Sequence, residues 1–193
     1  MILWPKAKRS ISPATAKQIA AVARRHSAQP VAVFVDEDAD TIARVCEAAD
    51  VQIAQLHGDG ARASVSQLQL DLRVVYVMHA EKDGTLQTPV PQLDRQLDWI
   101  LMDSLKGGSG ESFDWQQLRP PLELCTSGWL LAGGLGPHNV AEAIQTAQPS
   151  GVDVSSGVCG PDGLRKDADK VVGFVTGAQQ AFAAQRQRQV PCR

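Results

Sequence analysis

Short apolar runs alternate with stretches of helical periodicity along the whole chain. Seven runs rich in Val, Ile and Leu are predicted to be strands: Met1–Trp4, Val31–Val35, Val51–Leu56, Val74–Met78, Trp99–Met102, Trp129–Ala132 and Gly151–Val154. Six segments between them are predicted to be helices: Pro13–Arg25, Thr41–Ala48, Ala61–Leu70, Asp114–Leu118, His138–Ala147 and Lys166–Ala184. The strand runs are continuous rather than alternating in polarity, which is typical of parallel strands buried on both faces. The pattern therefore predicts an α/β fold with a parallel sheet.

The strand count leaves two arrangements open. A (βα)8 TIM barrel has eight strands, whereas the chain offers seven and begins within the run Met1–Trp4, which no turn or helix precedes. Either the barrel is incomplete because its first βα unit is absent, or the sheet is open. We expect one domain over residues 1–184. The segment 185–193 lacks a core pattern and is expected to be a disordered tail.

Composition narrows the function classes. The chain has 193 residues, 44% hydrophobic and 21% charged, with a net charge of −2. Such a balance gives no reason to expect nucleic acid or an anionic membrane as a partner. No apolar run approaches the length of a membrane span. The four cysteines, Cys46, Cys125, Cys159 and Cys192, have no metal-ligand spacing, so we expect neither a metal site nor a cofactor.

Two Gly/Ser turns follow the last two predicted strands. Gly133-Gly134 comes directly after Leu130–Ala132, and Ser155-Ser156-Gly157 comes directly after Gly151–Val154. Glycines allow a ligand to approach the backbone closely, and free N–H groups at such turns can bind an anion. Loops after the last two strands of an α/β barrel often form a phosphate site in this way. Ordinary tight strand-to-helix turns are the alternative.

Asp103 ends an apolar run and is a candidate general acid. A carboxyl group among apolar walls tends to have a raised pKa, as an acid catalyst requires. A helix cap or a loop carboxylate would have the same position in the sequence. The glycine-dense segment Lys106–Gly110 follows it, and either a mobile lid or a plain connector fits that composition.

Five motifs in order resemble phosphoribosylanthranilate isomerase, the (βα)8 barrel of tryptophan biosynthesis that performs an Amadori rearrangement. They are Trp4-Pro5-Lys6-Ala7-Lys8-Arg9-Ser10-Ile11-Ser12, Gln55-Leu56-His57-Gly58, Met102-Asp103 with Gly107-Gly108-Ser109-Gly110 and Phe113-Asp114-Trp115, Ala132-Gly133-Gly134-Leu135, and Asp153-Val154-Ser155-Ser156-Gly157-Val158. The resemblance runs from Met1 to about Thr176 and is strongest to the plant and green-algal branch. It implies an incomplete barrel of about seven strands rather than an open sheet.

The resemblance also implies roles for individual residues. Asp103 matches the general acid that protonates the ribose ring oxygen. Arg9 matches the arginine that pairs with the anthranilate carboxylate. His57 and Asp153 match polar residues that help to position the substrate. Without the resemblance, Arg9 would be read as a solvated loop residue and His57 as a structural one. The phosphate site matches Gly133, Gly134, Ser155, Ser156 and Gly157.

One departure from the family pattern concerns the general base. The family has a cysteine in a Lys-x-Cys-Gly stretch about thirty residues before the Trp-Pro-Lys motif, and none of the four cysteines here occupies that position. We therefore expect weak turnover from this chain and an open sheet edge prone to self-association. The resemblance implies phosphoribosylanthranilate as the small-molecule substrate, a monomer for the intact protein, and the plastid stroma, with the cytoplasm as the alternative. A non-catalytic phosphate-binding protein and another sugar-phosphate barrel enzyme remain alternative functions.

Overall fold

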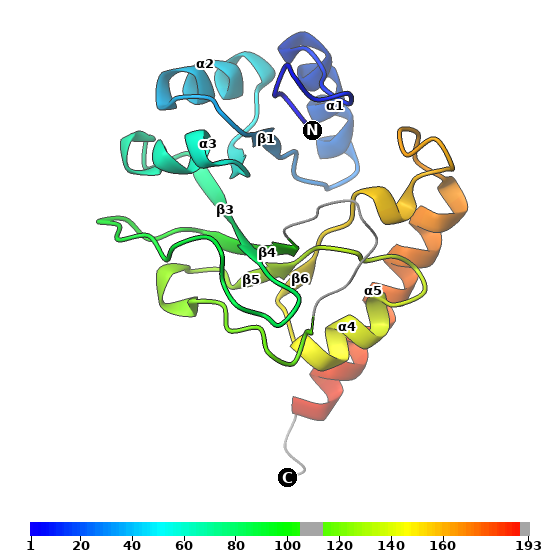
Figure 1. Ribbon diagram of the computed structural model, residues 1–193. Helices are drawn as coiled ribbons and strands as arrows, with labels where there is room; N and C mark the ends of the chain where they lie inside the picture. The colour runs from blue at the N-terminus through cyan, green and yellow to red at the C-terminus, as the bar shows by residue number, and fades with distance from the viewer. Residues whose placement is uncertain (105–113, 190–193) are drawn as a thin grey trace. The chain divides into compact units, whose positions relative to one another are not determined.

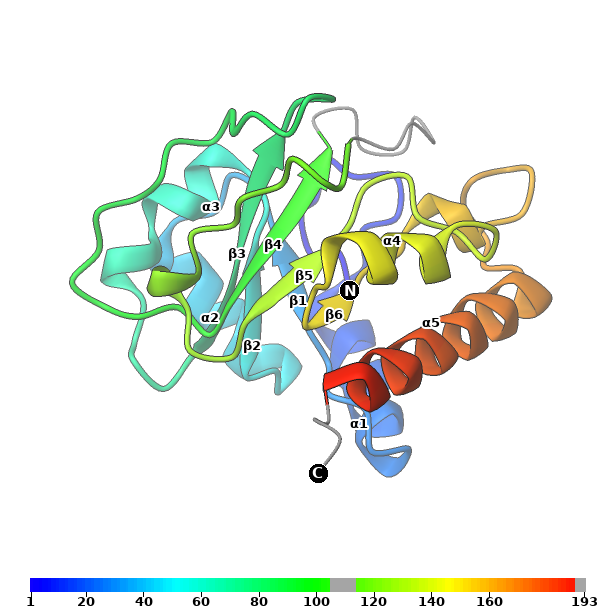
Figure 2. The same ribbon diagram turned by 90° about the horizontal axis from the view of Figure 1, so that it is seen from below.

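The computed structural model describes residues 1–104 and 114–189, and its α-helices and strands are labelled in Figures 1 and 2. The described residues fall into two compact units. The first unit comprises Met1–Val77, Val90–Ile100 and Glu123–Thr126. The second unit takes its described residues from Met78–Pro89, Leu101–Leu122 and Ser127–Arg193. One domain over residues 1–184 stays a prediction.

The strands form one parallel sheet in the order in which they occur along the chain. They are β1 (Ala32–Phe34), β2 (Ile53–Leu56), β3 (Arg73–Ala80), β4 (Trp99–Ser104), β5 (Trp129–Leu131) and β6 (Gly151–Val152). Within the described residues the order ends at β1 and β6, so the sheet does not close. An α/β fold with the strand order of an incomplete barrel is thereby confirmed.

The run Met1–Trp4 contributes a bridge instead of a seventh strand. Ile2 pairs with Val33 of β1 as an isolated parallel bridge. The amide of Leu3 donates to the carbonyl of Val33 at 3.1 Å, and the amide of Val33 donates to that of Met1 at 2.8 Å. This run therefore lies parallel to β1, but Pro5 lies at the start of a turn and ends the pairing early.

In the first unit, two capped helices pack against each other: α1 (Pro13–Arg25) and α2 (Ala39–Ala49). The hydroxyl of Ser12 accepts the amide of Thr15 at 3.2 Å, and the carboxylate of Asp38 accepts that of Thr41 at 2.9 Å. Such N-caps satisfy donors that the first helical turn leaves free. The short helix α3 (Asp59–Ala63) and the 3₁₀ helix η1 (Val65–Gln67) replace the single helix predicted over Ala61–Leu70.

In the second unit, the helices α4 (Val140–Ala147) and α5 (Ala168–Gln189) lie side by side, as both views show (Figures 1 and 2). Between them the chain forms β6 and the 3₁₀ helix η3 (Ser156–Val158). A third 3₁₀ helix, η2 (Leu122–Leu124), precedes β5. None of the helices in the described part of the chain is long and apolar enough to cross a membrane.

Most element ends lie within two residues of the prediction, but two further predictions differ from the structure by more than that. The helix predicted over Asp114–Leu118 is wrong: residues 115–117 form a turn, in which the carboxylate of Asp114 accepts the amide of Gln116 at 3.0 Å. Pro120 and Pro121 follow immediately and prevent a helix from continuing. At the other end, α5 continues to Gln189, five residues into the segment expected to be a tail. These five residues are all Gln or Arg, which are good helix formers.

Candidate functional site

The first Gly/Ser turn begins where β5 ends. The amide of Ala132 donates to the carbonyl of Met102 at 2.8 Å, which extends the strand pairing by one residue. Gly133 and Gly134 then adopt φ angles of 83° and 66°, a left-handed conformation that favours glycine. Within the described residues, neither of their amides donates to an acceptor. The turn therefore presents free N–H donors.

The second turn lies in contact with the first. A Cβ atom added to Gly157 would lie 1.9 Å from the carbonyl oxygen of Leu135, which no real side chain could tolerate. Glycine at this position is what lets the segment after β6 approach the segment after β5. Ser155 and Ser156 are exposed on the second turn. The five predicted phosphate-site residues thus lie on two turns of one unit.

Asp103 is placed near the end of β4 in the same unit. Its side chain is half-buried, and burial raises its pKa to about 6. The amide of Ser104, which donates to its carboxylate at 2.8 Å, lowers the pKa in part, and the neighbouring charge of Asp153 raises it again. The carboxyl group can therefore hold a proton close to neutral pH, as a general acid must.

Asp153 follows β6 and is the second acid of this unit. Its side chain is exposed, yet the protein atoms around the carboxylate remove part of its hydration, which raises its pKa. The positive charge of Lys166 opposes this rise. Lys166 also donates to the carbonyl of Ser155 at 2.7 Å, so this lysine contacts the second turn directly.

Arg9 and His57 belong to the first unit. Arg9 is half-buried in the loop before α1, and its guanidinium bonds to no other residue in the described ranges. His57 follows β2, and its amide donates to the carbonyl of Phe34 at 2.8 Å. Burial lowers the pKa of His57, and so does the positive charge of Arg62, which donates to the His57 carbonyl and pairs with Asp59. His57 is therefore held as a neutral imidazole near pH 7.

Two of the cysteines are in structural positions. Cys46 is buried in α2, and burial raises its pKa to about 12, so it remains a thiol at neutral pH. The Sγ atom of Cys159 is 3.4 Å from the carbonyl oxygen of Ser155 and donates to it. The predicted glycine-dense segment after Asp103, including Phe113, and the terminal Cys192 lie outside the described residues.

Comparison with known proteins bears on what this arrangement does. Residues 1–177 match the sequence model of the family described as N-(5'-phosphoribosyl)anthranilate (PRA) isomerase. The chain belongs to the PRA isomerase family. The resemblance seen in the five sequence motifs is thereby confirmed over most of the chain.

The relatives of this PRA isomerase family member include plant and bacterial proteins. Isomerases 1 and 2 of Arabidopsis thaliana, both named chloroplastic, are 50% identical to it over 180 residues, which cover 93% of this chain and 66% of theirs. The chain therefore spans just under two thirds of the length of these plant relatives. A solved structure of the isomerase from Thermotoga maritima shares 29% identity, with a TM-score of 0.73 and coverage of 93% of this chain and 86% of that one.

One solved PRA isomerase contains a ligand. It is described as a complex with reduced 1-(o-carboxyphenylamino)-1-deoxyribulose 5-phosphate, hereafter the reduced product analogue. It is 27% identical to this chain, with a TM-score of 0.68, and the match covers 93% of this chain and 86% of that one. That protein therefore binds a phosphorylated sugar carrying a carboxyphenylamino group.

Sequence reasoning missed three side chains that contact the two turns or the residues directly after them. Lys166 contacts the carbonyl of Ser155, Lys170 donates to the carbonyl of Cys159 at 2.8 Å, and Asn139 contacts the segment after Gly133. The lysines are 11 residues from their acceptors, so no local pattern reveals them. The helix predicted over His138–Ala147 places Asn139 within its first turn, so the sequence pattern did not mark this residue either.

Proposed function

We propose that this chain provides the acid and the phosphate-binding part of a phosphoribosylanthranilate isomerase that acts in tryptophan biosynthesis. The observation that carries the proposal is the pKa of Asp103, raised to about 6, in the unit that also presents two touching Gly/Ser turns. A proton donor beside a phosphate site suits a sugar-phosphate isomerisation that begins by opening a ring. Family membership supplies the identity of the substrate class.

In this proposal the reaction begins with proton transfer from Asp103. The carboxyl group gives its proton to the ring oxygen of the ribose, and the bond between that oxygen and C1′ breaks. The lone pair of the anthranilate nitrogen forms the C=N bond of a protonated Schiff base. Loss of the proton on C2′ then gives an enaminol, which becomes the 1-amino-1-deoxyketose product. The base for this second step is not assigned to a residue of this chain.

The remaining site residues are proposed to hold the substrate. The amides of Gly133 and Gly134, with Ser155, Ser156 and Gly157 of the other turn, would bind the phosphate group through backbone donors. Arg9 would pair with the anthranilate carboxylate, since a guanidinium matches a carboxylate with two parallel hydrogen bonds. His57 and Asp153 would bind the sugar hydroxyl groups.

Calorimetric titration with the reduced product analogue tests the proposal. We expect the chain to bind it, and we expect Gly134→Val to weaken binding at least tenfold, because a β-branched side chain cannot readily adopt a φ of 66°. Gly163→Val, at a glycine of the same unit with a φ of 67° and no described atom within 4 Å of an added Cβ, is the control for general damage. No binding by the wild-type chain would refute the proposed site.

The catalytic part is tested by isomerisation of phosphoribosylanthranilate. Loss of a general acid costs about 10²–10⁴ in rate, so Asp103→Asn should lower kcat by that factor while the analogue still binds. Equal turnover by both chains would remove Asp103 from the mechanism. A wild-type chain that binds the analogue and shows no isomerisation would instead support the function of a phosphate-ligand binding protein.

We propose the plastid as the location, because the two plant relatives are both named chloroplastic. Expression of the complete coding sequence fused to a fluorescent protein tests this proposal, and a purely cytosolic signal would contradict it. That the chain is a monomer stays a prediction, which light scattering at several concentrations would check.

A further inference from the structure

Asn139 stands at the N-cap position of α4 without capping the helix. Its φ and ψ are −131° and −7°, and its side chain makes no capping hydrogen bond. Asparagine at an N-cap usually accepts an amide of the first helical turn, which stabilises the helix. The caps of the first unit do so, through Ser12 and Asp38. At Asn139 the side-chain amide is used elsewhere.

The side-chain amide of Asn139 binds the first Gly/Ser turn at two points. Its Nδ2 donates to the carbonyl of Gly134 at 3.0 Å, and its Oδ1 accepts the amide of Gly136 at 2.8 Å. A carbonyl can only accept and an amide N–H can only donate, so these two partners fix which end of the side chain faces which group. Both bonds run backwards from the helix start to the turn.

These two bonds set the orientation of two successive peptide groups. In a trans peptide, the C=O and the following N–H point in opposite directions. Holding the carbonyl of Gly134 therefore directs the amide of Leu135 away from Asn139. Holding the amide of Gly136 directs the carbonyl of Leu135 away from Asn139 as well, and this carbonyl is the atom that a Cβ at Gly157 would meet at 1.9 Å.

We propose that Asn139 is a positioning residue for the phosphate site, which orders the Gly133–Gly136 turn and, through Leu135, its contact with Gly157. This inference rests on the proposed function of the two turns. Glycine-rich segments lose much conformational entropy on ordering, and a turn that is ordered before the ligand arrives binds it more tightly. Asn139 does not touch the phosphate; it anchors the chain directly after the Gly133 and Gly134 amides that would bind it.

Asn139→Ser separates this role from helix capping. Serine is as good an N-cap as asparagine, carries no charge, and is too short to bridge the carbonyl of Gly134 and the amide of Gly136. We expect affinity for ribose 5-phosphate to fall about tenfold, the effect of roughly one hydrogen bond. The midpoint of thermal unfolding should change by no more than a few degrees.

Asn139→Asp is the second variant. Aspartate keeps the acceptor for the amide of Gly136, loses the donor to the carbonyl of Gly134, and is favourable at a helix N-terminus. A capping role predicts unchanged or higher stability and unchanged affinity, whereas the positioning role predicts weaker binding. Since the added charge also repels phosphate, a loss in Asn139→Asp counts only together with a loss in the uncharged Asn139→Ser.

Calorimetry with ribose 5-phosphate, and with ribose as the phosphate-free control, gives the result. Asp38→Asn, which alters the cap of α2 in the first unit, is the matched control and should leave affinity unchanged. If the wild-type chain binds ribose 5-phosphate and Asn139→Ser binds it equally well, the role of Asn139 is refuted while the phosphate site stands. If the wild-type chain binds neither sugar, the phosphate site itself is refuted.

Discussion

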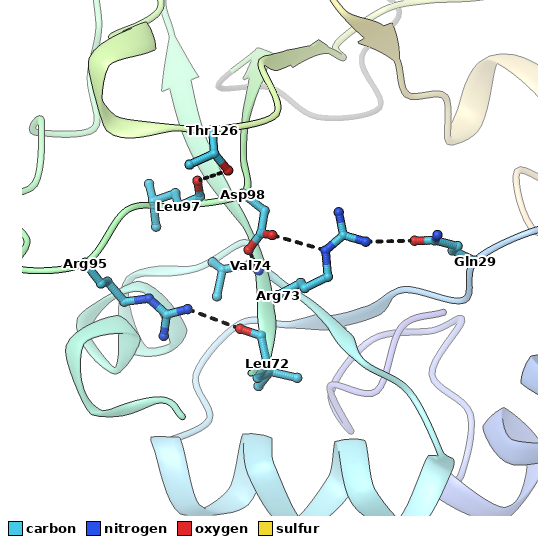
Figure 3. Close-up of polar contacts among 8 residues, drawn as sticks. All are labelled: Gln29, Leu72, Arg73, Val74, Arg95, Leu97, Asp98 and Thr126. Atoms are coloured by element: carbon cyan, nitrogen blue, oxygen red, sulfur yellow. Dashed lines mark hydrogen bonds and ion pairs between the residues drawn. The ribbon is translucent and has the colours of Figure 1, made fainter. Parts of the chain in front are cut away.

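Two aspartates at the two ends of strand β4 differ in the charges that surround them. Asp98, directly before the strand, is ion-paired with Arg73 at 3.1 Å and accepts the amide of Val74 at 2.8 Å (Figure 3). Asp103, near the end of the strand, lies close to a second carboxylate and is half-buried, and its pKa is raised to about 6. Both residues are acids next to apolar residues in sequence, yet only one has its charge neutralised.

The arginine side chains near Asp98, those of Arg73 and Arg95, both make hydrogen bonds. Arg73 donates to Gln29, while Arg95 donates to the carbonyl of Leu72 at 3.2 Å (Figure 3). The guanidinium of Arg73 also lies 4.2 Å from the centroid of the Trp99 ring. Such paired charges hold structure together. At Asp103 the protein instead retains an unfavourable charge environment. In parallel α/β folds, the ends after the strands are where chemistry occurs and the ends before them are where stability resides.

The largest effect on stability is expected from Asp98→Ala. This change removes the acceptor of a charged hydrogen bond from Arg73 and leaves the amide of Val74 without its partner. Charged hydrogen bonds contribute about 1.5–3 kcal/mol each and an unpaired buried donor costs a similar amount, so the free energy of unfolding should fall by about 2–4 kcal/mol. Urea denaturation monitored by circular dichroism measures it.

Asp98→Asn provides the matched control, since an amide oxygen can still accept from Val74 while the charge is lost. It should cost less than Asp98→Ala, and both variants should bind the reduced product analogue as the wild type does. Unchanged stability in Asp98→Ala, or a specific loss of ligand affinity, would remove the distinction between the two ends of β4.

A smaller effect of opposite sign is expected from Asp103→Asn. The pKa of Asp103 is about 6 in the folded chain and near the ordinary 3.8 when unfolded. Between these values the folded state binds more protons than the unfolded state, so the wild type loses stability as pH rises from about 4 to 6. Asp103→Asn lacks this loss and should be more stable at pH 7, by roughly 1–3 kcal/mol.

The pH dependence distinguishes this effect from any general benefit of asparagine. The advantage of Asp103→Asn should shrink as pH falls and be absent below about pH 4, where both states of the wild type are protonated. Unfolding midpoints in urea at pH 4, 5, 6 and 7 measure it. An advantage that is the same at every pH would show that the charge of Asp103 is not its cause.

Much of the fold could be predicted because the signals are local. Ser12-Pro13 gives the start of α1, and its whole span, Pro13–Arg25, matches the prediction. Asp103 was placed correctly near a strand end because the apolar run before it is uninterrupted. The two Gly/Ser turns follow their strands as predicted. In each case a few adjacent residues carry the information.

The contacts that distinguish the two ends of β4 could not be predicted in this way. Arg73 and Asp98 are separated by 25 residues, and nothing in either segment indicates the other. The contact of Asn139 with the carbonyl of Gly134 could not be predicted from the sequence for another reason. An asparagine at an N-cap is expected to bind its own helix, and only the folded structure shows that this one does not. Long-range partners and side-chain directions depend on the tertiary structure.

The smallest of these effects on stability is expected from Arg73→Lys. This change keeps a positive charge next to Asp98 but replaces the planar guanidinium by an ammonium group. Lysine can still reach Asp98, but it cannot also donate to Gln29 from a planar group or stack on Trp99. Because Arg73 is partly exposed, the lost cation–π contact is worth about 0.5–1 kcal/mol. Urea denaturation should therefore show a fall well below that of Asp98→Ala. Equal losses in the two variants would mean that the stacked geometry of Arg73, rather than the neutralised charge of Asp98, is what stabilises this end of the strand.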